Sequence, residues 1–405
     1  MNALGAASNE FEGLGGNDTI IGNGNTRIAF YNATAGVTVD LQAGTASGDT
    51  SVGSDTFTGV NAVYGSNFDD TIIGDANQNF VEGRAGNDFI DGGGNFDSVS
   101  YSNSPNGVAV NLSTGTAADG WGGTDTLANF EFVSGSAFAD TIIGSVNGNE
   151  TFEGRGGNDL IDGGGHVNGN PFGDLVHYTG AATSGITVDL DAGTATDGLG
   201  GTDTLINIDS VNASRFNDIV IGNANNNLLR GFDGNDTIHG GDGNDRIEGD
   251  QSFNPSLLGN DVLYGDAGQD TILGNAGDDR LDGGADSDVL IGGTGADTFV
   301  YTTTADGLDH ISDFDGHGGQ TDVIEFNHLA FGNGLGAGGL NTGTLDASHF
   351  IADNIGPTDV VQVFWYNTDD HTLYYDADGN GAGSAIAIAV LDNGFVLNHT
   401  DLVLV

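Results

Sequence analysis

The chain has 405 residues, of which 72 are glycine and none is cysteine, so disulfides and thiolate metal sites are excluded. Seven lysines and arginines stand against 58 aspartates and glutamates, and the formal charge of −51 at pH 7 disfavours nucleic acid and anionic membrane surfaces as partners. No apolar run reaches the length of about 20 residues that spans a bilayer, so no membrane insertion is expected, and the plentiful oxygen ligands favour hard cations such as calcium.

The beginning of the chain, MNALGAASNEFEGLGG, lacks the positive region and the apolar region of a secretory signal peptide. If the protein is exported, another signal is therefore expected to direct it. A first short repeat, GLGGNDTII, begins at Gly13.

A longer repeat occurs three times, over residues 36–64, 107–134 and 185–212, and leads each time into shorter repeats. In each copy, the aspartate of an S/T-D-T segment stands fifteen residues before the first aspartate of the array that follows. These aspartates are Asp55, Asp125 and Asp203. The constant spacing predicts that the long repeats are built into the same solenoid as the short ones.

Nonapeptides follow one another without gaps over residues 65–100, 213–248 and 265–300. Units such as GRAGNDFID, GFDGNDTIH and GNAGDDRLD share early glycines, an aspartate at the sixth place and an apolar residue at the eighth. A further unit, GRGGNDLID, begins at Gly154. This pattern predicts a short strand that buries one side chain, preceded by a glycine-rich turn.

The units resemble the G-G-x-G-x-D-x-U-x nonapeptide of RTX (repeats-in-toxin, hemolysin-type) calcium-binding proteins. The resemblance implies an all-β fold, a parallel β-roll or β-solenoid, in which two nonapeptides form one coil. Units two apart then stack, and an aspartate pair with turn carbonyls would cage each of several calcium ions (Ca2+). The implied pairs are Asp70 with Asp88, Asp236 with Asp261, Asp245 with Asp270, Asp261 with Asp279, Asp270 with Asp288, and Asp279 with Asp297.

The candidate calcium ligands are the aspartates at the sixth place or its equivalent. They are Asp18, Asp70, Asp88, Asp97, Asp140, Asp159, Asp174, Asp218, Asp236, Asp245, Asp261, Asp270, Asp279, Asp288 and Asp297. Asn79 and Asn227 occupy the same place without a charge, so sites there are weaker candidates. Aspartate and glycine also favour solvated turns in general, but that alternative does not account for a register repeated across three arrays.

The sequence changes character after Val300, where it becomes richer in aromatic residues and ends in DLVLV. A solenoid end exposes a strand edge that needs a cap, so residues 1–300 are predicted to form the solenoid and residues 301–405 a β-rich capping domain. The latter also resembles the targeting region of type I secretion substrates, which implies a type I exporter as a partner. DADGNG, from Asp376, opens like an EF-hand loop but lacks the closing glutamate, and a polar turn is expected.

Calcium binding and folding are predicted to be one event. One apolar position per nonapeptide cannot offset the entropy lost on ordering the backbone, and the aspartates add a repulsion that bound cations would remove. Extracellular calcium modules bind with dissociation constants of about 10⁻⁴ to 10⁻³ M. The chain would therefore stay open in the cytosol and fold outside the cell.

The sequence contains neither the H-E-x-x-H of metalloproteases nor the G-x-S-x-G of lipases, and the chain is not expected to be an enzyme. The predicted function is that of a secreted bacterial calcium-binding protein, structural or adhesive at a cell surface or in a matrix. The alternative is a calcium-dependent carbohydrate-binding module or a non-catalytic part of a larger secreted enzyme. Extracellular polysaccharide or a cell surface is the expected partner, and insertions at residues 166–172 and 251–257 are expected to be loops.

Overall fold

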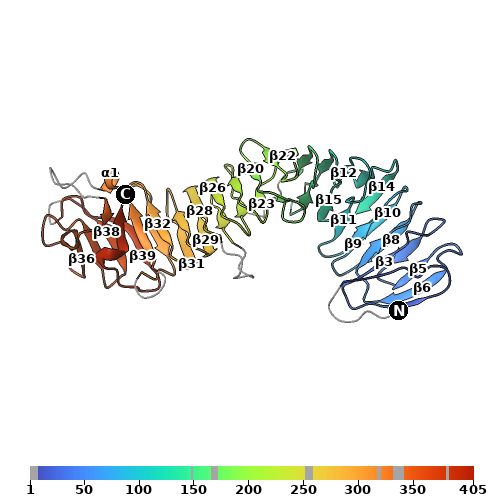
Figure 1. Ribbon diagram of the computed structural model, residues 1–405, viewed down its shortest axis with the longest axis horizontal. Coiled ribbons are helices and arrows are strands. Elements are labelled where there is room, and N and C mark those ends of the chain that lie inside the picture. Colours follow the sequence, from blue (N-terminus) through green and yellow to red (C-terminus); the bar gives the residue numbers. More distant parts are fainter. Residues whose placement is uncertain are drawn as a thin grey trace. The chain divides into compact units, whose positions relative to one another are not determined.

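The computed structural model describes residues 8–146, 149–165, 172–250, 259–316, 321–331, 342–379 and 383–405. Within these ranges the chain consists of short strands, joined by turns, with little helix (Figure 1). The helical elements are α1 (His328–Phe331) and the 3-10 turns η2 (Ala347–His349) and η3 (His399–Asp401). The predicted all-β class is confirmed.

The chain divides into two compact units. The first unit comprises Met1–Thr183 and Gly193–Ile208, and the second comprises Ser184–Ala192 and Asp209–Val405. In both units the strands form two sheets, which we call sheets A and B, and the strands of successive nonapeptides alternate between them.

The strands of the first unit are as follows. Sheet A contains β2 (Thr19–Ile21), β4 (Thr38–Asp40), β5 (Thr45–Ser47), β6 (Ser54–Thr58), β8 (Thr71–Asp75), β10 (Phe89–Gly93), β12 (Ala109–Asn111), β13 (Thr116–Ala118), β14 (Thr124–Ala128), β16 (Thr141–Ile143), β18 (Leu160–Asp162), β21 (Thr194–Thr196) and β22 (Thr202–Ile206). Sheet B contains β1 (Asn9–Phe11), β3 (Thr26–Ala29), β7 (Ala62–Tyr64), β9 (Phe80–Glu82), β11 (Ser98–Ser100), β15 (Phe132–Ser134), β17 (Thr151–Glu153) and β19 (Leu175–His177).

The strands of the second unit follow the same scheme. Sheet A contains β20 (Thr187–Asp189), β24 (Ile219–Ile221), β26 (Thr237–Asp242), β28 (Val262–Ala267), β30 (Arg280–Asp282), β32 (Thr298–Tyr301), β34 (Val323–Phe326), β35 (Gly343–Thr344) and β40 (Leu402–Leu404). Sheet B contains β23 (Ser210–Asn212), β25 (Leu228–Arg230), β27 (Arg246–Glu248), β29 (Thr271–Ala276), β31 (Val289–Thr294), β33 (Asp309–Ile311), β36 (Phe350–Asp353), β37 (Phe364–Asn367), β38 (Thr372–Tyr375) and β39 (Ile386–Leu391).

Nonapeptides two apart in the sequence pair in parallel. Ile72 of β8 is the partner of Ile90 of β10 in sheet A, and Val81 of β9 is the partner of Val99 of β11 in sheet B. All four of these eighth-place side chains are 0% exposed. Two nonapeptides therefore make one coil around an apolar core, and the predicted parallel β-roll is confirmed.

The long repeats contain antiparallel strands, which the sequence did not reveal. Strand β5 pairs antiparallel with both β4 and β6, and β13 pairs in the same way with β12 and β14. The third strand of each copy then returns to the parallel stack, since β6 pairs with β2, β14 with β10 and β22 with β18. That strand carries Asp55, Asp125 or Asp203, so the long repeats join the solenoid as their spacing predicted.

The residues after Val300 extend both sheets of the second unit. Strand β33 pairs with β31 and β34 with β32, after which β39 and β40 pair with β33 and β34. An aromatic cluster fills the interior, where the ring of Phe326 lies 4.8 Å from that of Phe364 and 4.9 Å from that of Phe331. This segment covers the end of the array at residue 300, and its status as a separate domain stays a prediction.

In the described ranges, no helix is both long enough and apolar enough to cross a membrane. The described part of the DADGNG segment, Asp376 to Gly379, forms a turn after β38. The insertions predicted at 166–172 and 251–257 lie outside the described residues, apart from Phe172.

Candidate metal centres

The sixth-place aspartates of the second unit form two continuous rows, which we call aspartate ladders. In each ladder, the main-chain N–H of one aspartate donates to the Oδ1 atom of the aspartate on the next coil, at 2.7 to 3.1 Å. The ladder beside sheet A is Asp218, Asp236, Asp261, Asp279, Asp297 and Asp322. The ladder beside sheet B is Asn227, Asp245, Asp270, Asp288 and Asp309. Five of the six predicted pairs lie here as neighbours.

The other carboxylate oxygen, Oδ2, is buried in most ladder members and has no hydrogen-bond partner. This holds for Asp236, Asp245, Asp261, Asp270, Asp279, Asp288, Asp297 and Asp309. A buried carboxylate oxygen without a partner is costly unless a cation compensates its charge. The ladders therefore present rows of buried oxygens that lack a positive partner within the described part of the chain.

Burial also shifts the protonation of these carboxyl groups. Loss of solvation, together with the charges of neighbouring aspartates and against the opposing main-chain hydrogen bonds, raises the pKa of Asp236, Asp261 and Asp279 to about 8. A bound cation would act in the opposite direction and favour the charged carboxylates.

The glycines at the first place let carboxylate and carbonyl oxygens pack close together. A β-carbon on Gly274 would lie 2.3 Å from Oδ2 of Asp279 and 2.6 Å from the carbonyl oxygen of Gly292. Gly265 stands in the same relation to Asp270 and to the carbonyl oxygen of Gly283. Oxygens from two coils thus approach each of these glycines closely, and any larger residue at the first place would collide with them.

This donor set fits calcium, which takes carboxylate and carbonyl oxygens in flexible geometry. Among the described residues, no three acidic or histidine side chains come together as a metal site. Main-chain carbonyls would therefore have to complete each site, as the resemblance to RTX repeats implies.

The first unit contains shorter ladders on the same plan. The main-chain N–H of Asp70 donates to Oδ1 of Asp88 at 2.8 Å, and that of Asp88 donates to Oδ1 of Asp125 at 3.1 Å. The equivalent rows are Asp140, Asp159 and Asp203; Asp18 and Asp55; Asn79, Asp97 and Glu131; and Glu150 and Asp174. Oδ2 is buried and has no hydrogen-bond partner in Asp88, Asp97 and Asp159.

Three predicted ligands already have polar partners for both carboxylate oxygens. In Asp70, Oδ1 accepts hydrogen bonds from the Val37 N–H and the Ser66 hydroxyl, and Oδ2 accepts one from the Ser66 N–H. Asp140 and Asp218 begin their ladders in the same way, with Ser136 and Ser214. A serine at the second place thus compensates the first carboxylate of a ladder, so these three need a cation least.

The asparagines at the sixth place are also satisfied without an ion. Oδ1 of Asn79 accepts the N–H of Asp75 at 2.7 Å, and Oδ1 of Asn227 accepts the N–H of Asn223 at 2.8 Å. This agrees with the weaker prediction made for these two positions.

Three further buried aspartates resemble the ladder members in their environment but were not among the ligands predicted from the sequence. Asp119, Asp250 and Asp309 are buried, and each has a carboxylate oxygen without a hydrogen-bond partner. Asp309 stands 21 residues after Asp288, instead of the usual eighteen, so the fixed register missed it. Alignment of the long repeats with one another would have drawn attention to Asp119.

In the calcium-free chain, the stability of the ladders is expected to fall as the pH rises. An unfolded aspartate has a pKa of about 3.9, whereas burial raises that of Asp261 to about 8. The folded state therefore binds more protons between these values, and its stability is present at low pH and is lost as the pH rises through the folded pKa. Circular dichroism of the calcium-depleted chain should show more β signal at about pH 5 than at about pH 8. Asp261→Asn should reduce this difference, and a β signal that is unchanged or lower at the acidic pH would contradict the prediction.

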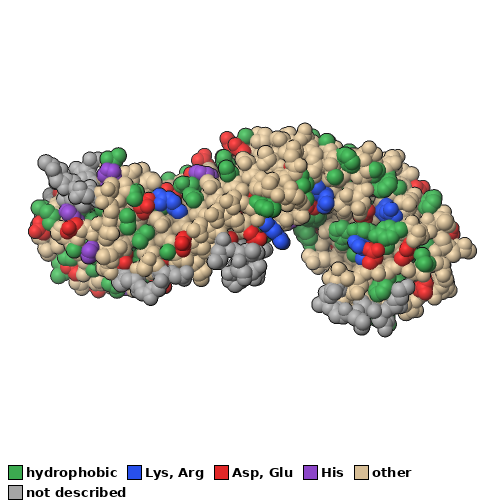
Figure 2. All heavy atoms as spheres, in the orientation of Figure 1, with side chains coloured by type: hydrophobic (Ala, Val, Ile, Leu, Met, Phe, Trp, Pro, Cys, Tyr) green, Lys and Arg blue, Asp and Glu red, His purple; other side chains and the backbone are tan. Residues whose placement is uncertain are grey.

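The burial of the ladders is reflected in the surface of the molecule. Figure 2 shows one face, on which acidic side chains are few and scattered although the chain has 58 of them. Many of the aspartates lie in the ladders instead of on the surface.

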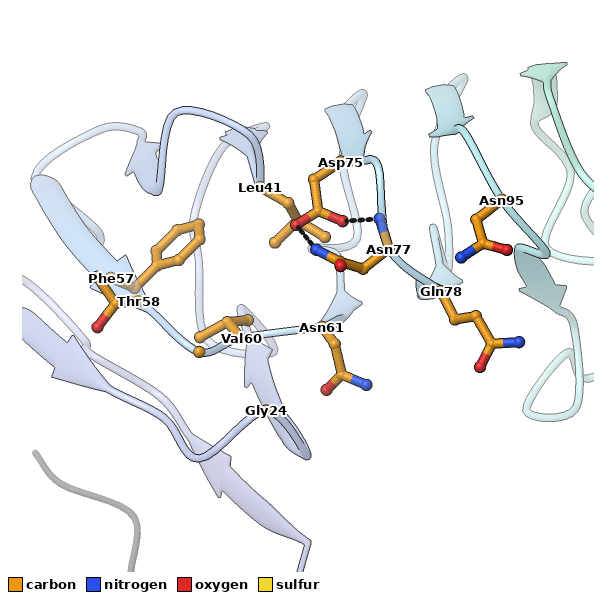
Figure 3. A pocket seen from close by; sticks show the side chains of 11 residues that line it. Gly24, Leu41, Phe57, Thr58, Val60, Asn61, Asp75, Asn77, Gln78 and Asn95 are labelled. Carbon is orange, nitrogen blue, oxygen red and sulfur yellow. Dashed lines mark hydrogen bonds between the residues drawn. The ribbon is translucent and has the colours of Figure 1, made fainter.

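A separate groove of about 560 Å³ lies in the first unit, next to the first long repeat. Figure 3 shows Asp75 in this groove, held by the main-chain and side-chain N–H groups of Asn77, with the amides of Asn61, Gln78 and Asn95 along the same wall. A smaller groove of about 220 Å³ occurs at the second long repeat, between equivalents such as Leu112, Leu127 and Ser145. The groove is therefore a repeated feature that combines apolar and polar side chains.

Comparison with known families supports the sequence pattern. The profile of the RTX calcium-binding nonapeptide repeat matches residues 5–26, 64–99, 145–168, 209–251, 257–290 and 264–299. No curated protein matches the chain significantly. The matched segments cover the nonapeptide arrays and leave most of the long repeats unmatched.

Proposed function

Because the chain is built on RTX calcium-binding nonapeptide repeats, we propose that it is a secreted protein that folds on calcium outside the cell and serves a structural or adhesive role there. The observation that supports this best is the pair of ladders in the second unit. Their buried oxygens have no partner that the described chain supplies, and calcium would supply one at every coil. The proposal includes no catalytic activity.

The chain's own residues prepare these sites. The N–H to Oδ1 hydrogen bonds hold each carboxylate in register, and Oδ2 is left to face the glycine turn. Calcium supplies the positive charge that these oxygens lack. Because each aspartate is bonded to the coils on both sides, ordering one coil favours the next, as in other repeat proteins.

We further propose that the C-terminal segment carries the export signal for a type I exporter. In the folded chain, β40 is paired with β34. A signal in this strand would therefore be read from the open chain, which low cytosolic calcium would maintain.

The groove of Figure 3 favours a second candidate function, calcium-dependent carbohydrate binding. Amide and carboxylate side chains at Asn61, Asp75 and Gln78 can exchange hydrogen bonds with sugar hydroxyls, and Phe57 and Leu41 offer apolar contacts. This function would also depend on calcium through the folding of the surrounding coils.

One expression experiment tests both the location and the role. With a type I exporter present, the full chain is expected in the medium or on the cell surface, and a chain truncated after Asn341 is expected to remain in the cell, as immunoblots of each fraction would show. Cells that export the full chain should attach to a solid surface more strongly in calcium than in chelator. Retention of neither chain, or attachment that ignores calcium, would contradict the proposal.

A glycan array, read with and without calcium, separates the two candidate functions. Calcium-dependent binding of a defined glycan, lost on replacing Asp75 and Gln78 with alanine, would favour the carbohydrate-binding function. Attachment without binding of any glycan would favour the structural role.

A further inference from the structure

The loop of the second long repeat holds a buried carboxylate that lies outside the nonapeptide register. Asp119 follows β13 and is 0% exposed. Its Oδ1 atom accepts the N–H groups of Trp121, Gly122 and Gly123 at 2.8, 2.8 and 2.9 Å. Its Oδ2 atom is buried and has no hydrogen-bond partner. Oδ1 of Asp119 therefore holds the turn through three hydrogen bonds, while Oδ2 has neither a hydrogen-bond donor nor a positive charge beside it among the described residues.

This second oxygen points at the adjoining coil. A β-carbon on Gly123 would lie 2.9 Å from Oδ2 of Asp119 and 1.8 Å from the carbonyl oxygen of Gly86. Asp88, two residues after Gly86, has its own buried Oδ2 without a hydrogen-bond partner. Gly123 therefore packs closely against both groups, where a side chain would collide with them. The charges of Asp119 and Asp88 also act on each other, so two buried carboxylates and a carbonyl from neighbouring turns come together here.

The loop has the form of a nonapeptide, although no RTX match covers it. Residues 120–128 read GWGGTDTLA, with Asp125 at the sixth place and Leu127 at the eighth. Asp125 closes the ladder, and its Oδ2 accepts the hydroxyl of Tyr101 at 3.1 Å. The extra aspartate, Asp119, stands immediately before this unit.

The other long repeats provide a natural comparison. In the third copy, Asp197 is 1% exposed and its Oδ1 accepts three N–H groups at 2.7 to 2.8 Å, whereas its Oδ2 receives one long hydrogen bond of 3.3 Å from Gly157. In the first copy, Asp49 is exposed, and the hydroxyls of Thr34 and Ser51 occupy its two oxygens. The buried arrangement therefore recurs in the second and third copies and is absent from the first.

We propose that Asp119 and Asp197 each complete a further calcium site where a long repeat joins the nonapeptide stack. Asp88 or Asp159 and the carbonyls of the adjacent turns complete the sites. These ions hold the antiparallel strands of the long repeat against the parallel coil beside them. The inference rests on the proposed calcium-binding function and extends it to a part of the chain outside the recognised repeats.

Terbium, which replaces calcium at oxygen sites and luminesces when a nearby indole is excited, is a direct probe, because Trp121 belongs to the loop. The full chain loaded with terbium and excited selectively at tryptophan should emit strongly. Asp119→Asn, which keeps the Oδ1 acceptor of the turn, should abolish most of this emission. Trp121→Phe should do the same, whereas Trp365→Phe and the matched control Asp49→Asn should leave it unchanged.

Equilibrium dialysis against calcium gives the second measurement. Asp119→Asn and Asp197→Asn should each lower the number of bound ions by one, and the double variant by two, while Asp49→Asn should have no effect. Unchanged stoichiometry and emission in a variant chain that still binds calcium would overturn this inference and leave the proposed function intact. A wild-type chain that binds no calcium would overturn both. If Asp119→Asn fails to fold, the Trp121→Phe variant decides. Terbium emission as strong as that of the wild-type chain in Trp121→Phe would show that no ion lies at the loop and would overturn the inference.

Discussion

In excess chelator at neutral pH, the chain is expected to lose most of its β-sheet circular dichroism signal and to regain it at about 10⁻⁴ to 10⁻³ M calcium. The physical reason is the row of buried carboxylates in each ladder. Without ions, these groups must either stay charged in a poorly solvated place or take up protons. Burial raises the pKa of Asp245 and Asp270 to about 7 and that of Asp261 to about 8, so protonation is incomplete at neutral pH and a fraction of the carboxylates stays charged. Both alternatives destabilise the folded state.

Two controls separate specific binding from general screening of the charge of −51. Sodium chloride at matched ionic strength screens repulsion between exposed charges but does not occupy the buried sites. Magnesium demands octahedral geometry and gives up its water reluctantly, so it should restore the signal poorly. A fully β-rich spectrum in chelator, or equal recovery in sodium chloride, would show that calcium is not part of the fold.

Replacing Asp279 with asparagine is expected to raise the calcium midpoint of folding on the order of tenfold, because an interaction with a charged ligand is worth at least about 1.5 kcal/mol. Asp279 stands in the middle of the longest ladder and is bonded to both Asp261 and Asp297. One substitution therefore affects two neighbouring sites. The array at 265–300 adjoins the C-terminal segment that covers its edge, so folding is expected to begin there and spread.

Substitution by asparagine removes the charge of the aspartate but keeps the size and shape of its side chain. At the sixth place, Asn227 keeps an Oδ1 acceptor and donates from Nδ2 to the carbonyl oxygen of Asp209 at 3.0 Å. By the strand register, the carbonyl oxygen of Asp261 stands to position 279 as that of Asp209 stands to Asn227, so the new side-chain amide of Asp279→Asn would have an equivalent acceptor. The variant should therefore reach the wild-type β signal at saturating calcium.

Asp97→Asn is the matched comparison and should shift the midpoint much less. Its ladder is short: Asn79 on one side has no charge, and Glu131 on the other side ends the row. Asp278→Asn, an exposed neighbour of Asp279, controls for the loss of one charge. Calcium titrations followed by circular dichroism decide the matter, and equal shifts for positions 279 and 97 would refute both the pairing scheme and the C-terminal starting point.

The sequence by itself determined the coil. The nonapeptide pattern predicts a short strand that buries one side chain, and its resemblance to RTX repeats implies that units two apart stack in parallel. The resemblance also implied the pairing of Asp70 with Asp88 and of Asp279 with Asp297, and in the structure the main-chain N–H of the first residue of each pair donates to Oδ1 of the second. The match of the nonapeptide arrays to the RTX repeat profile follows from the same regularity.

Only the tertiary structure decided which buried carboxylates have an oxygen without a hydrogen-bond partner. Asp70 and Asp88 look alike in sequence, but Ser66 and the N–H of Val37 satisfy the first and leave the second with a buried, unpartnered oxygen. The antiparallel turn that buries Asp119 was equally hidden, because Asp49 occupies a similar place in the first long repeat and remains exposed. The physical reason is that a repeat fixes the position of a side chain along a coil, whereas its solvation and hydrogen-bond partners depend on the coils and loops packed beside it.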